Sequence, residues 1–230
     1  MFTKKRILIF SGFVVAILLG ALLWNQGLVG SSDKKLYSYI KDRPDLIELY
    51  NRAKKGEEEI AKTPDKAVLY FNVGLDWKSI AERLETNKRE FYKRSLAVYE
   101  QGIKKFGQKN ILFYLNGGKL AEHVEGYTKA EKYYRKAIEI APGDESGYLY
   151  LVDLYSYKMN KPKAEVLKVF EEGMKKMMNP ALLISGRATY LNRIGDYEAA
   201  LKDYEQLVTI FPNHQGYKDL VVELSAKIKQ

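Results

Sequence analysis

From residue 45 onward, apolar residues recur three or four positions apart, the spacing that places side chains on one face of an α-helix. The segment 45–62 shows this pattern weakly, because a charged run interrupts it. The segment 65–84 shows it clearly, and Thr63 followed by a proline is a typical helix start. Another helix is expected from near residue 87 up to Gly107, a residue type that often follows a helix end. The pattern therefore predicts an all-α domain over residues 34–230.

Two later segments, residues 126–142 and 195–212, carry the same landmarks in the same order. A tyrosine, an alanine, a second tyrosine and a proline stand 70 residues apart in the two copies: Tyr127 and Tyr197, Ala130 and Ala200, Tyr134 and Tyr204, Pro142 and Pro212. Two units of roughly 34 residues fill about 68 of these positions, so the unit between them should be about two residues longer. The turn at residues 160–164 is the expected place for that surplus.

These positions resemble the tetratricopeptide repeat family, and the segments that precede them add Tyr114, Gly118, Ala121, Ala188 and Leu191 to the resemblance. It implies a right-handed α-solenoid of antiparallel helix pairs. The expected units are a degenerate or elongated pair at 65–110, repeats at 111–144, 145–180 and 181–214, and a capping helix at 215–230. Val152 and Leu207 depart from the family, which prefers smaller residues at those two positions.

In this family the first helix of each pair lines the concave face of the solenoid. Carried onto this sequence, the resemblance implies nine groove positions for a peptide or a partner helix: Leu115, Lys119, His123, Leu149, Asp153, Tyr157, Ser185, Thr189 and Arg193. The alternative is that some of them pack between helices, with Leu115 and Leu149 the first candidates. Family members that hold the carboxylate tails of heat-shock chaperones repeat Lys and Asn in these slots. Here Lys119 stands alone, which argues against that class of ligand.

Residues 7–24 form an uncharged apolar run of 18 residues, long enough at about 1.5 Å per residue to cross a bilayer. We interpret it as one transmembrane helix between a short basic cytoplasmic tail at 1–6 and a flexible linker at 25–33. The cations of the tail abut the run, which favours a cytoplasmic N-terminus and a repeat domain outside the cytoplasmic membrane. The alternative is a cleaved signal peptide, which would make the protein secreted and soluble.

Small residues recur on one face of this apolar run. Gly12, Ala16 and Gly20 stand four positions apart, a spacing that lets two membrane helices approach closely. We therefore hypothesise a homodimer through this face. The alternative is that Gly and Ala are simply frequent in membrane helices.

The composition excludes several kinds of site and partner but does not identify the function. The chain has 230 residues, no cysteine and a net charge of +9, so disulfides and thiolate metal sites are excluded. No basic run is interleaved with aromatic residues, which argues against a nucleic-acid partner. The acidic run at 57–59 is interpreted as a solvated helix face rather than a metal site.

Residues with the spacing of a catalytic, metal or cofactor site are missing from the sequence. His123 and His214 are the only histidines, and residues 117–119 lack the first glycine and the final Ser or Thr of a phosphate loop. The sequence therefore predicts a membrane-tethered interaction protein that is not an enzyme and that binds a protein or peptide. An accessory or chaperone-like subunit of a secretion or envelope-assembly machine shares this architecture and stays open, as does an enzyme without a recognisable motif.

Overall fold

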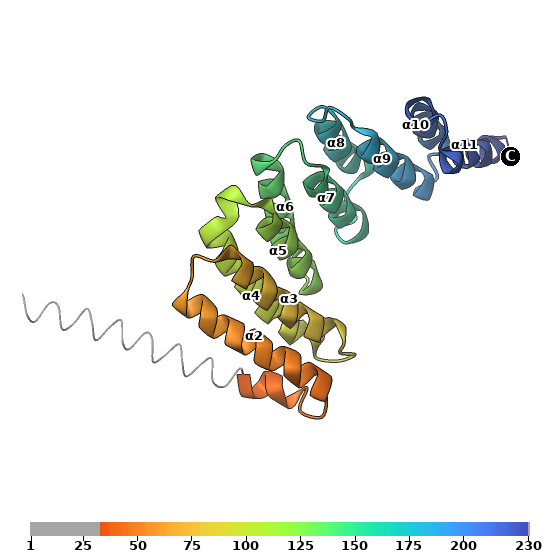
Figure 1. The fold of residues 1–230 in the computed structure, drawn as a ribbon. Coiled ribbons are helices and arrows are strands. Elements are labelled where there is room, and N and C mark those ends of the chain that lie inside the picture. Colours follow the sequence, from red (N-terminus) through yellow and green to blue (C-terminus); the bar gives the residue numbers. More distant parts are fainter. Residues whose placement is uncertain (1–32, 230) are drawn as a thin grey trace, which may run out of the picture.

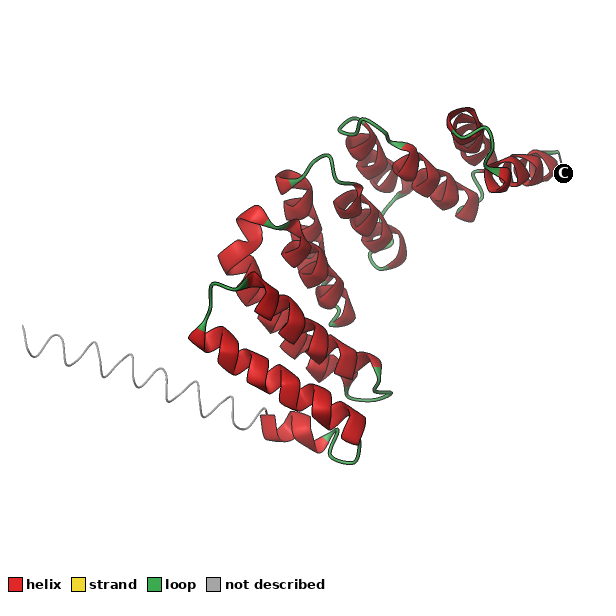
Figure 2. Cartoon of the chain, in the orientation of Figure 1, coloured by secondary structure: helices red, strands yellow, loops and turns green. Residues whose placement is uncertain are grey.

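The computed structural model describes residues 33–229, which form a curved row of helices joined by short loops (Figures 1 and 2). Residues 33–38 are helical. The elements that follow are α2 (Pro44–Lys62), α3 (Ala67–Glu82), α4 (Lys88–Phe106), the 3-10 helix η1 (Gly107–Lys109), α5 (Ile111–His123), α6 (Tyr127–Ile140), α7 (Glu145–Tyr157), α8 (Lys163–Met174), α9 (Ala181–Arg193), α10 (Tyr197–Ile210) and α11 (Gln215–Ile228). The all-α prediction is confirmed for the part of the chain that the structure describes.

Packing follows the order of the chain. Each helix packs mainly against the next one, and the pairs α5–α7 and α7–α9 add contacts between alternate helices. The buried apolar side chains form one continuous cluster that extends from Leu36 to Leu224. This nearest-neighbour arrangement is that of a solenoid, in which each helix is stabilised by the helices beside it.

The repeat landmarks meet at the contact between α5 and α6. Tyr134 is fully buried, and its ring occupies the space that a side chain on Gly118 would need. A Cβ atom at Gly118 would lie 2.3 Å from Cε1 of Tyr134, closer than a real contact allows. Ala130, also fully buried, lets the two helices approach one turn away. The glycine is therefore required by the tyrosine ring that faces it.

The helices α3 and α4 repeat the same arrangement. A Cβ atom at Gly74 would lie 2.3 Å from Cε2 of Tyr99, as at the Gly118 contact. Ser95 stands four residues before Tyr99, is fully buried, and donates a hydrogen bond of 2.6 Å to the carbonyl oxygen of Gly74. This pair thus packs as a repeat, with helices of 16 and 19 residues against 13 and 14 in α5 and α6.

Two local predictions had different outcomes. The surplus of the middle unit lies close to the predicted turn at 160–164, since residues 158–162 separate α7 from α8 whereas three residues separate α5 from α6; residues 163 and 164 already belong to α8. The prediction that Thr63 begins a helix is wrong. Its backbone N–H and its hydroxyl both bind the carbonyl oxygen of Glu59, at 2.8 and 2.9 Å, so Thr63 closes α2. The next helix, α3, begins at Ala67 without a side-chain cap.

The predicted transmembrane helix at 7–24 lies outside the described residues, together with the small residues Gly12, Ala16 and Gly20 and all but the end of the linker. Between residues 33 and 229, no helix combines the length and the apolar character needed to cross a bilayer.

Candidate functional site

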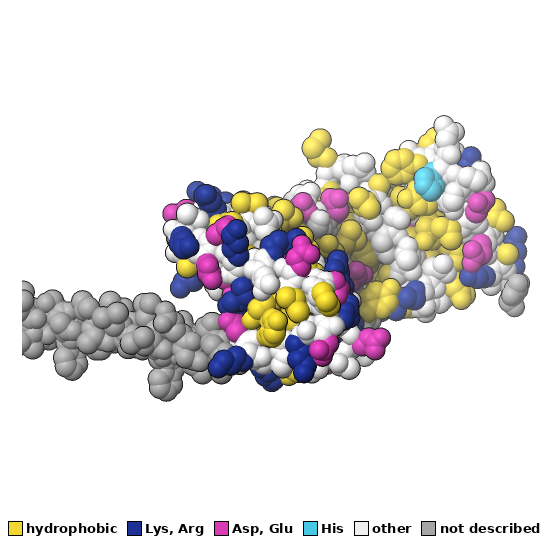
Figure 3. Space-filling view, turned by 60° about the horizontal axis from the view of Figure 1, so that its bottom comes forward, with side chains coloured by type: hydrophobic (Ala, Val, Ile, Leu, Met, Phe, Trp, Pro, Cys, Tyr) yellow, Lys and Arg dark blue, Asp and Glu magenta, His cyan; other side chains and the backbone are white. Residues whose placement is uncertain are grey.

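One face of the row is formed by the first helices of successive pairs, α5, α7 and α9, and we call it the first-helix face. Large apolar side chains stand exposed among polar ones on these helices, including Leu112, Tyr157 and Leu182, each more than half exposed. Figure 3 shows such hydrophobic side chains among charged ones on the surface of the domain. Exposed apolar side chains that gather on one face often belong to a contact surface.

A pocket of about 300 Å³ opens on this face between α7 and α9. Six of the nine predicted groove positions line it: Leu149, Asp153, Tyr157, Ser185, Thr189 and Arg193. The remaining lining residues are Val152, Ser156, Phe170, Leu182, Gly186 and Tyr190. The structure therefore brings two thirds of the predicted positions into one cavity. Whether a partner occupies it stays a prediction.

The floor of the pocket is apolar and depends on a glycine. Phe170 reaches it from α8 and is almost completely buried among its neighbours. A Cβ atom at Gly186 would lie 3.1 Å from both Cε1 of Phe170 and Cδ2 of Leu149. Gly186 therefore packs directly against the ring of Phe170, and a larger residue at position 186 would force Phe170 or Leu149 to shift. Leu182, 58% exposed, stands on the rim above this floor.

A cation marks the carboxyl end of α9. The guanidinium of Arg193 lies over the ring of Tyr157 at 4.3 Å and over the ring of Tyr190 at 5.3 Å. Asp153 faces the same pocket from α7. Burial raises the pKa of Asp153, and the charges of Lys119 and Arg193 oppose that shift only in part. The pocket thus combines an apolar floor with one cation and one carboxyl group.

The three predicted positions on α5 have other surroundings. Leu115 is 5% exposed and packs in the core, as the alternative interpretation of that residue required. Lys119 lies over the ring of Tyr150 at 4.5 Å, and its Nζ is 3.7 Å from a carboxylate oxygen of Glu122. His123 stacks on Tyr92 with the rings 4.1 Å apart, and burial lowers the pKa of His123. None of the three lines the pocket between α7 and α9.

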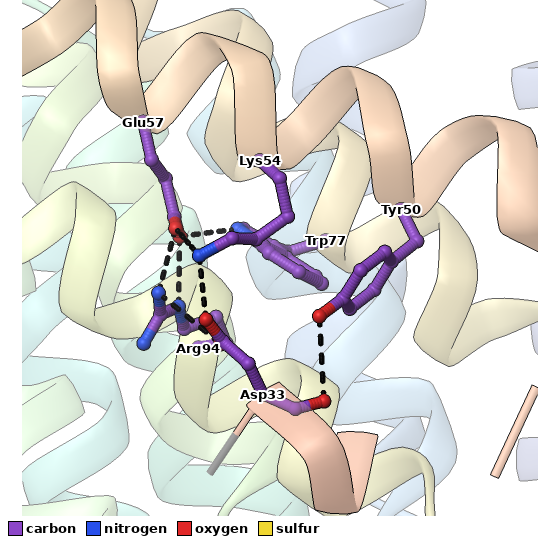
Figure 4. Close-up of polar contacts among 6 residues, drawn as sticks. All are labelled: Asp33, Tyr50, Lys54, Glu57, Trp77 and Arg94. Carbon is purple, nitrogen blue, oxygen red and sulfur yellow. Dashed lines mark hydrogen bonds and ion pairs between the residues drawn. The ribbon is translucent and has the colours of Figure 1, made fainter. Parts of the chain in front are cut away.

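A polar cluster away from the pocket, which the sequence did not indicate, connects the start of the described chain to α2, α3 and α4 (Figure 4). Glu57 is its centre and accepts hydrogen bonds from Arg94, Lys54 and Trp77. Lys54 also binds Asp33, at 2.6 Å. The interpretation of residues 57–59 as a solvated face is therefore wrong for Glu57. The sequence of an acidic run does not indicate which of its members faces a partly buried cation on another helix.

Comparisons with known proteins agree with this architecture. A family model described as "Tetratricopeptide repeat" matches residues 113–144 and 187–214. A tetratricopeptide repeat protein from Parabacteroides merdae is 18% identical, with 86% of this chain and 74% of that chain covered and a TM-score of 0.52. MamA from Desulfovibrio magneticus RS-1, residues 41 to the end, is 11% identical, with coverages of 79% and 94% and a TM-score of 0.52. These two likenesses show the fold. No curated protein sequence matches the chain.

Proposed function

We propose that this chain, which carries tetratricopeptide repeats, is an interaction protein that holds a segment of a protein partner in the pocket between α7 and α9. The observation that carries the proposal is the convergence of six predicted groove positions, from two different helices, on one cavity of about 300 Å³. Cavities of this size with an apolar floor and a few polar groups are typical of ligand sites.

The proposal also places the domain at a membrane. An anchor at residues 7–24 would hold the pocket near the membrane surface and raise its effective concentration toward partners there. The positive charges before the anchor favour a domain outside the cytoplasmic membrane. Two measurements test this part: alkaline carbonate extraction of the full chain from membranes, and N-terminal sequencing of the mature protein. A chain that begins after residue 24 would overturn the anchor and leave the pocket untouched.

Site-specific photo-crosslinking tests the pocket. The photoreactive residue p-benzoylphenylalanine replaces Thr189, which is exposed on α9 and lines the pocket. The matched control is Thr209 on α10, since both threonines are exposed and both hydroxyls bind the carbonyl oxygen four residues earlier. We expect the full chain in native membranes to form an adduct from position 189 and not from position 209.

A plug variant separates the pocket from the rest of the surface. Ser185→Trp places an indole ring at the pocket wall, where the serine is only partly buried. The adduct from position 189 should disappear in this variant, while thermal unfolding stays close to that of the parent chain. An adduct that persists in the plugged protein, or equal adducts from positions 189 and 209, would overturn the proposed site.

A further inference from the structure

We propose that the exposed cations of α4 and α6 bind the surface of an anionic lipid bilayer, the same bilayer that the predicted anchor at residues 7–24 would cross. We call these cations the basic surface. The inference rests on the anchor of the proposed function but not on its pocket, because α4 and α6 contribute no residue to the pocket between α7 and α9.

The positive charge of the domain is concentrated on these two helices. Together α4 and α6 contain ten Lys and Arg and four Glu, a net charge of +6. The net charge of residues 33–229 is also +6, so the other residues of the domain sum to zero. The first helices of the same two pairs, α3 and α5, contain two Lys and three acidic residues, a net charge of −1. The excess therefore lies on the second helices.

This excess does not continue along the row. The next second helices are acidic, since α8 has a net charge of −1 and α10 a net charge of −2. In the last pair the sign is reversed, because the first helix α9 contains two Arg and no acidic residue. The basic surface thus ends after α6. It belongs to the end of the domain at which the described chain begins, and a membrane contact would be limited to that end.

The cations are accessible and lie on neighbouring helices. Eight of the ten are exposed. Lys129 of α6 donates a hydrogen bond of 2.7 Å to Glu100 of α4, so the two helices present their charges side by side. Several of the cations form exposed ion pairs such as Lys93 with Glu90, and pairs of this kind are weak enough to be exchanged for lipid phosphates.

The start of the described chain is attached to the basic end of the domain. A carboxylate oxygen of Asp33 lies 3.6 Å from Nη2 of Arg94, which belongs to α4, and the other lies 2.6 Å from Nζ of Lys54 (Figure 4). The predicted linker at 25–33 can span only about 30 Å even when fully extended. The anchor would therefore keep α4 close to the bilayer and raise the effective concentration of lipid beside it.

Electrostatics favours this contact over a contact through the first helices. Each Lys or Arg close to an anionic bilayer strengthens binding about fivefold, and the effect extends over roughly 10 Å at 0.1 M salt. Only charges on the face that meets the lipid contribute, and α4 and α6 carry the cations at this end. Since both are second helices, the contact would leave the first-helix face and its pocket open to partners.

Energy transfer from single fluorophores to labelled lipid headgroups tests the inference. The chain has no cysteine, so one can be introduced at a chosen position. Ala97→Cys carries the donor on α4, and Asn72→Cys is the matched control on α3 of the same pair, because both residues are exposed. The full chain is reconstituted in vesicles of phosphatidylcholine alone or with one third phosphatidylglycerol. Transfer should be higher in the anionic vesicles from position 97 and not from position 72.

Salt and charge reversal identify the contact. The gain at position 97 should disappear in 1 M salt, where electrostatic interactions extend only about 3 Å. Reversing three exposed lysines of the basic surface should lower the ratio of docked to undocked domain about 100-fold. These are Lys88→Glu, Lys104→Glu and Lys132→Glu, which are in none of the ion pairs found between residues 33 and 229.

The matched control variant changes the net charge equally at exposed lysines beyond α6 that are also outside those ion pairs: Lys168→Glu, Lys202→Glu and Lys218→Glu. It should dock like the parent chain. Equal transfer from position 97 in both lipids would overturn the inference and assign the cations to another anionic partner. Equal losses in the two triple variants would also overturn it, since the total charge and not the basic surface would then be responsible.

The outcome is separable from that of the proposed function. If alkaline carbonate releases the chain from neutral vesicles, the anchor fails, and transfer from position 97 in anionic vesicles still decides whether the basic surface binds lipid. The adduct from position 189 depends on neither measurement, so the pocket is judged by the crosslinking experiment alone.

Discussion

Replacing Glu57 with glutamine removes the charge at the centre of the polar cluster that joins Asp33 to α2, α3 and α4. Glu57 accepts two hydrogen bonds from Arg94, at 2.7 and 2.6 Å, one from Lys54 at 3.1 Å and one from the indole of Trp77 at 2.9 Å. Glutamine has nearly the same volume and leaves no cavity. Its amide group, however, places donors against two cations that are themselves donors.

The size of the expected loss in stability depends on how deeply these two cations are buried. Removing one partner of a buried ion pair costs about 3–5 kcal/mol. The side chains of Arg94 and Lys54 are still 22% and 27% exposed, so water screens part of the charge that remains. We therefore expect Glu57→Gln to lower the free energy of unfolding of the α2–α4 region by about 2 kcal/mol.

Native-state hydrogen exchange is the suitable assay, because a repeat array can unfold locally. Amides in α2 and α4 should exchange about 30-fold faster in the variant, the factor that corresponds to this free energy, whereas amides in α9, α10 and α11 should not change. Glu58→Gln is the control, since it makes the same chemical change at the next residue of α2, which is exposed. If Glu57→Gln and Glu58→Gln behave alike, the cluster does not stabilise this end of the domain.

The difference in the free energy of unfolding between wild type and Glu57→Gln should depend on pH, and in one direction only. Burial alone would raise the pKa of Glu57, but the hydrogen bonds and charges of Arg94 and Lys54 outweigh burial and lower the pKa below its ordinary 4.5. A carboxyl group with a lowered folded-state pKa stabilises the fold above its unfolded pKa, and this contribution disappears as pH falls through the folded value. Wild type and Glu57→Gln should therefore differ fully above pH 4.5 and converge in acid. A difference that grows as pH falls would refute this account.

Two further substitutions test the packing between helices. Gly118→Ala forces a Cβ atom against the ring of Tyr134 and should lower the free energy of unfolding in urea by about 1–3 kcal/mol, whereas Gly143→Ala, in an exposed turn with its nearest neighbour at 4.0 Å, should have little effect. Asp203→Asn removes the charge that accepts hydrogen bonds from Nε and Nη2 of Arg187, at 2.8 and 2.6 Å, from a side chain that is 5% exposed. It should cost about 2 kcal/mol and lower the temperature of thermal unfolding followed by circular dichroism, and an unchanged temperature would contradict the role of this pair.

Much of the row of helices could be predicted because the packing of each repeat requires particular residue types at fixed positions in the sequence. Tyr134 requires a small residue opposite it, Gly118, and a second small residue one helical turn earlier, Ala130. Two such requirements that recur at a fixed period can be recognised in the sequence without a structure. The α3–α4 pair follows the same rule, with Tyr99 facing Gly74. The sequence alone does not reveal the register of this pair, because Ser95 stands where the later copies have an alanine.

The polar contacts could not be predicted in this way. Glu57 and Glu58 are adjacent in an acidic run, yet the first is bound to Arg94 across α2 and α4 while the second is exposed. The difference depends on which face of α2 packs against α4. That is set by the packing of the helices in space and not by the local sequence. Leu115 shows the same limit, since its position matches the groove pattern and its side chain is buried in the core.

The place of the pocket in the row bears on how such a protein can be specific. In a perfectly regular stack every seam between units would be equivalent, and no seam would bind one partner better than the next. Here α8 and α9 pack less extensively than any other consecutive pair of helices from α2 to α11, and the pocket opens beside them. The unit that ends with α8 has the longer loop at 158–162, and the family model does not match it. The irregularity that weakens the repeat pattern therefore coincides with a distinct cavity, which opens beside the least extensive contact between consecutive helices.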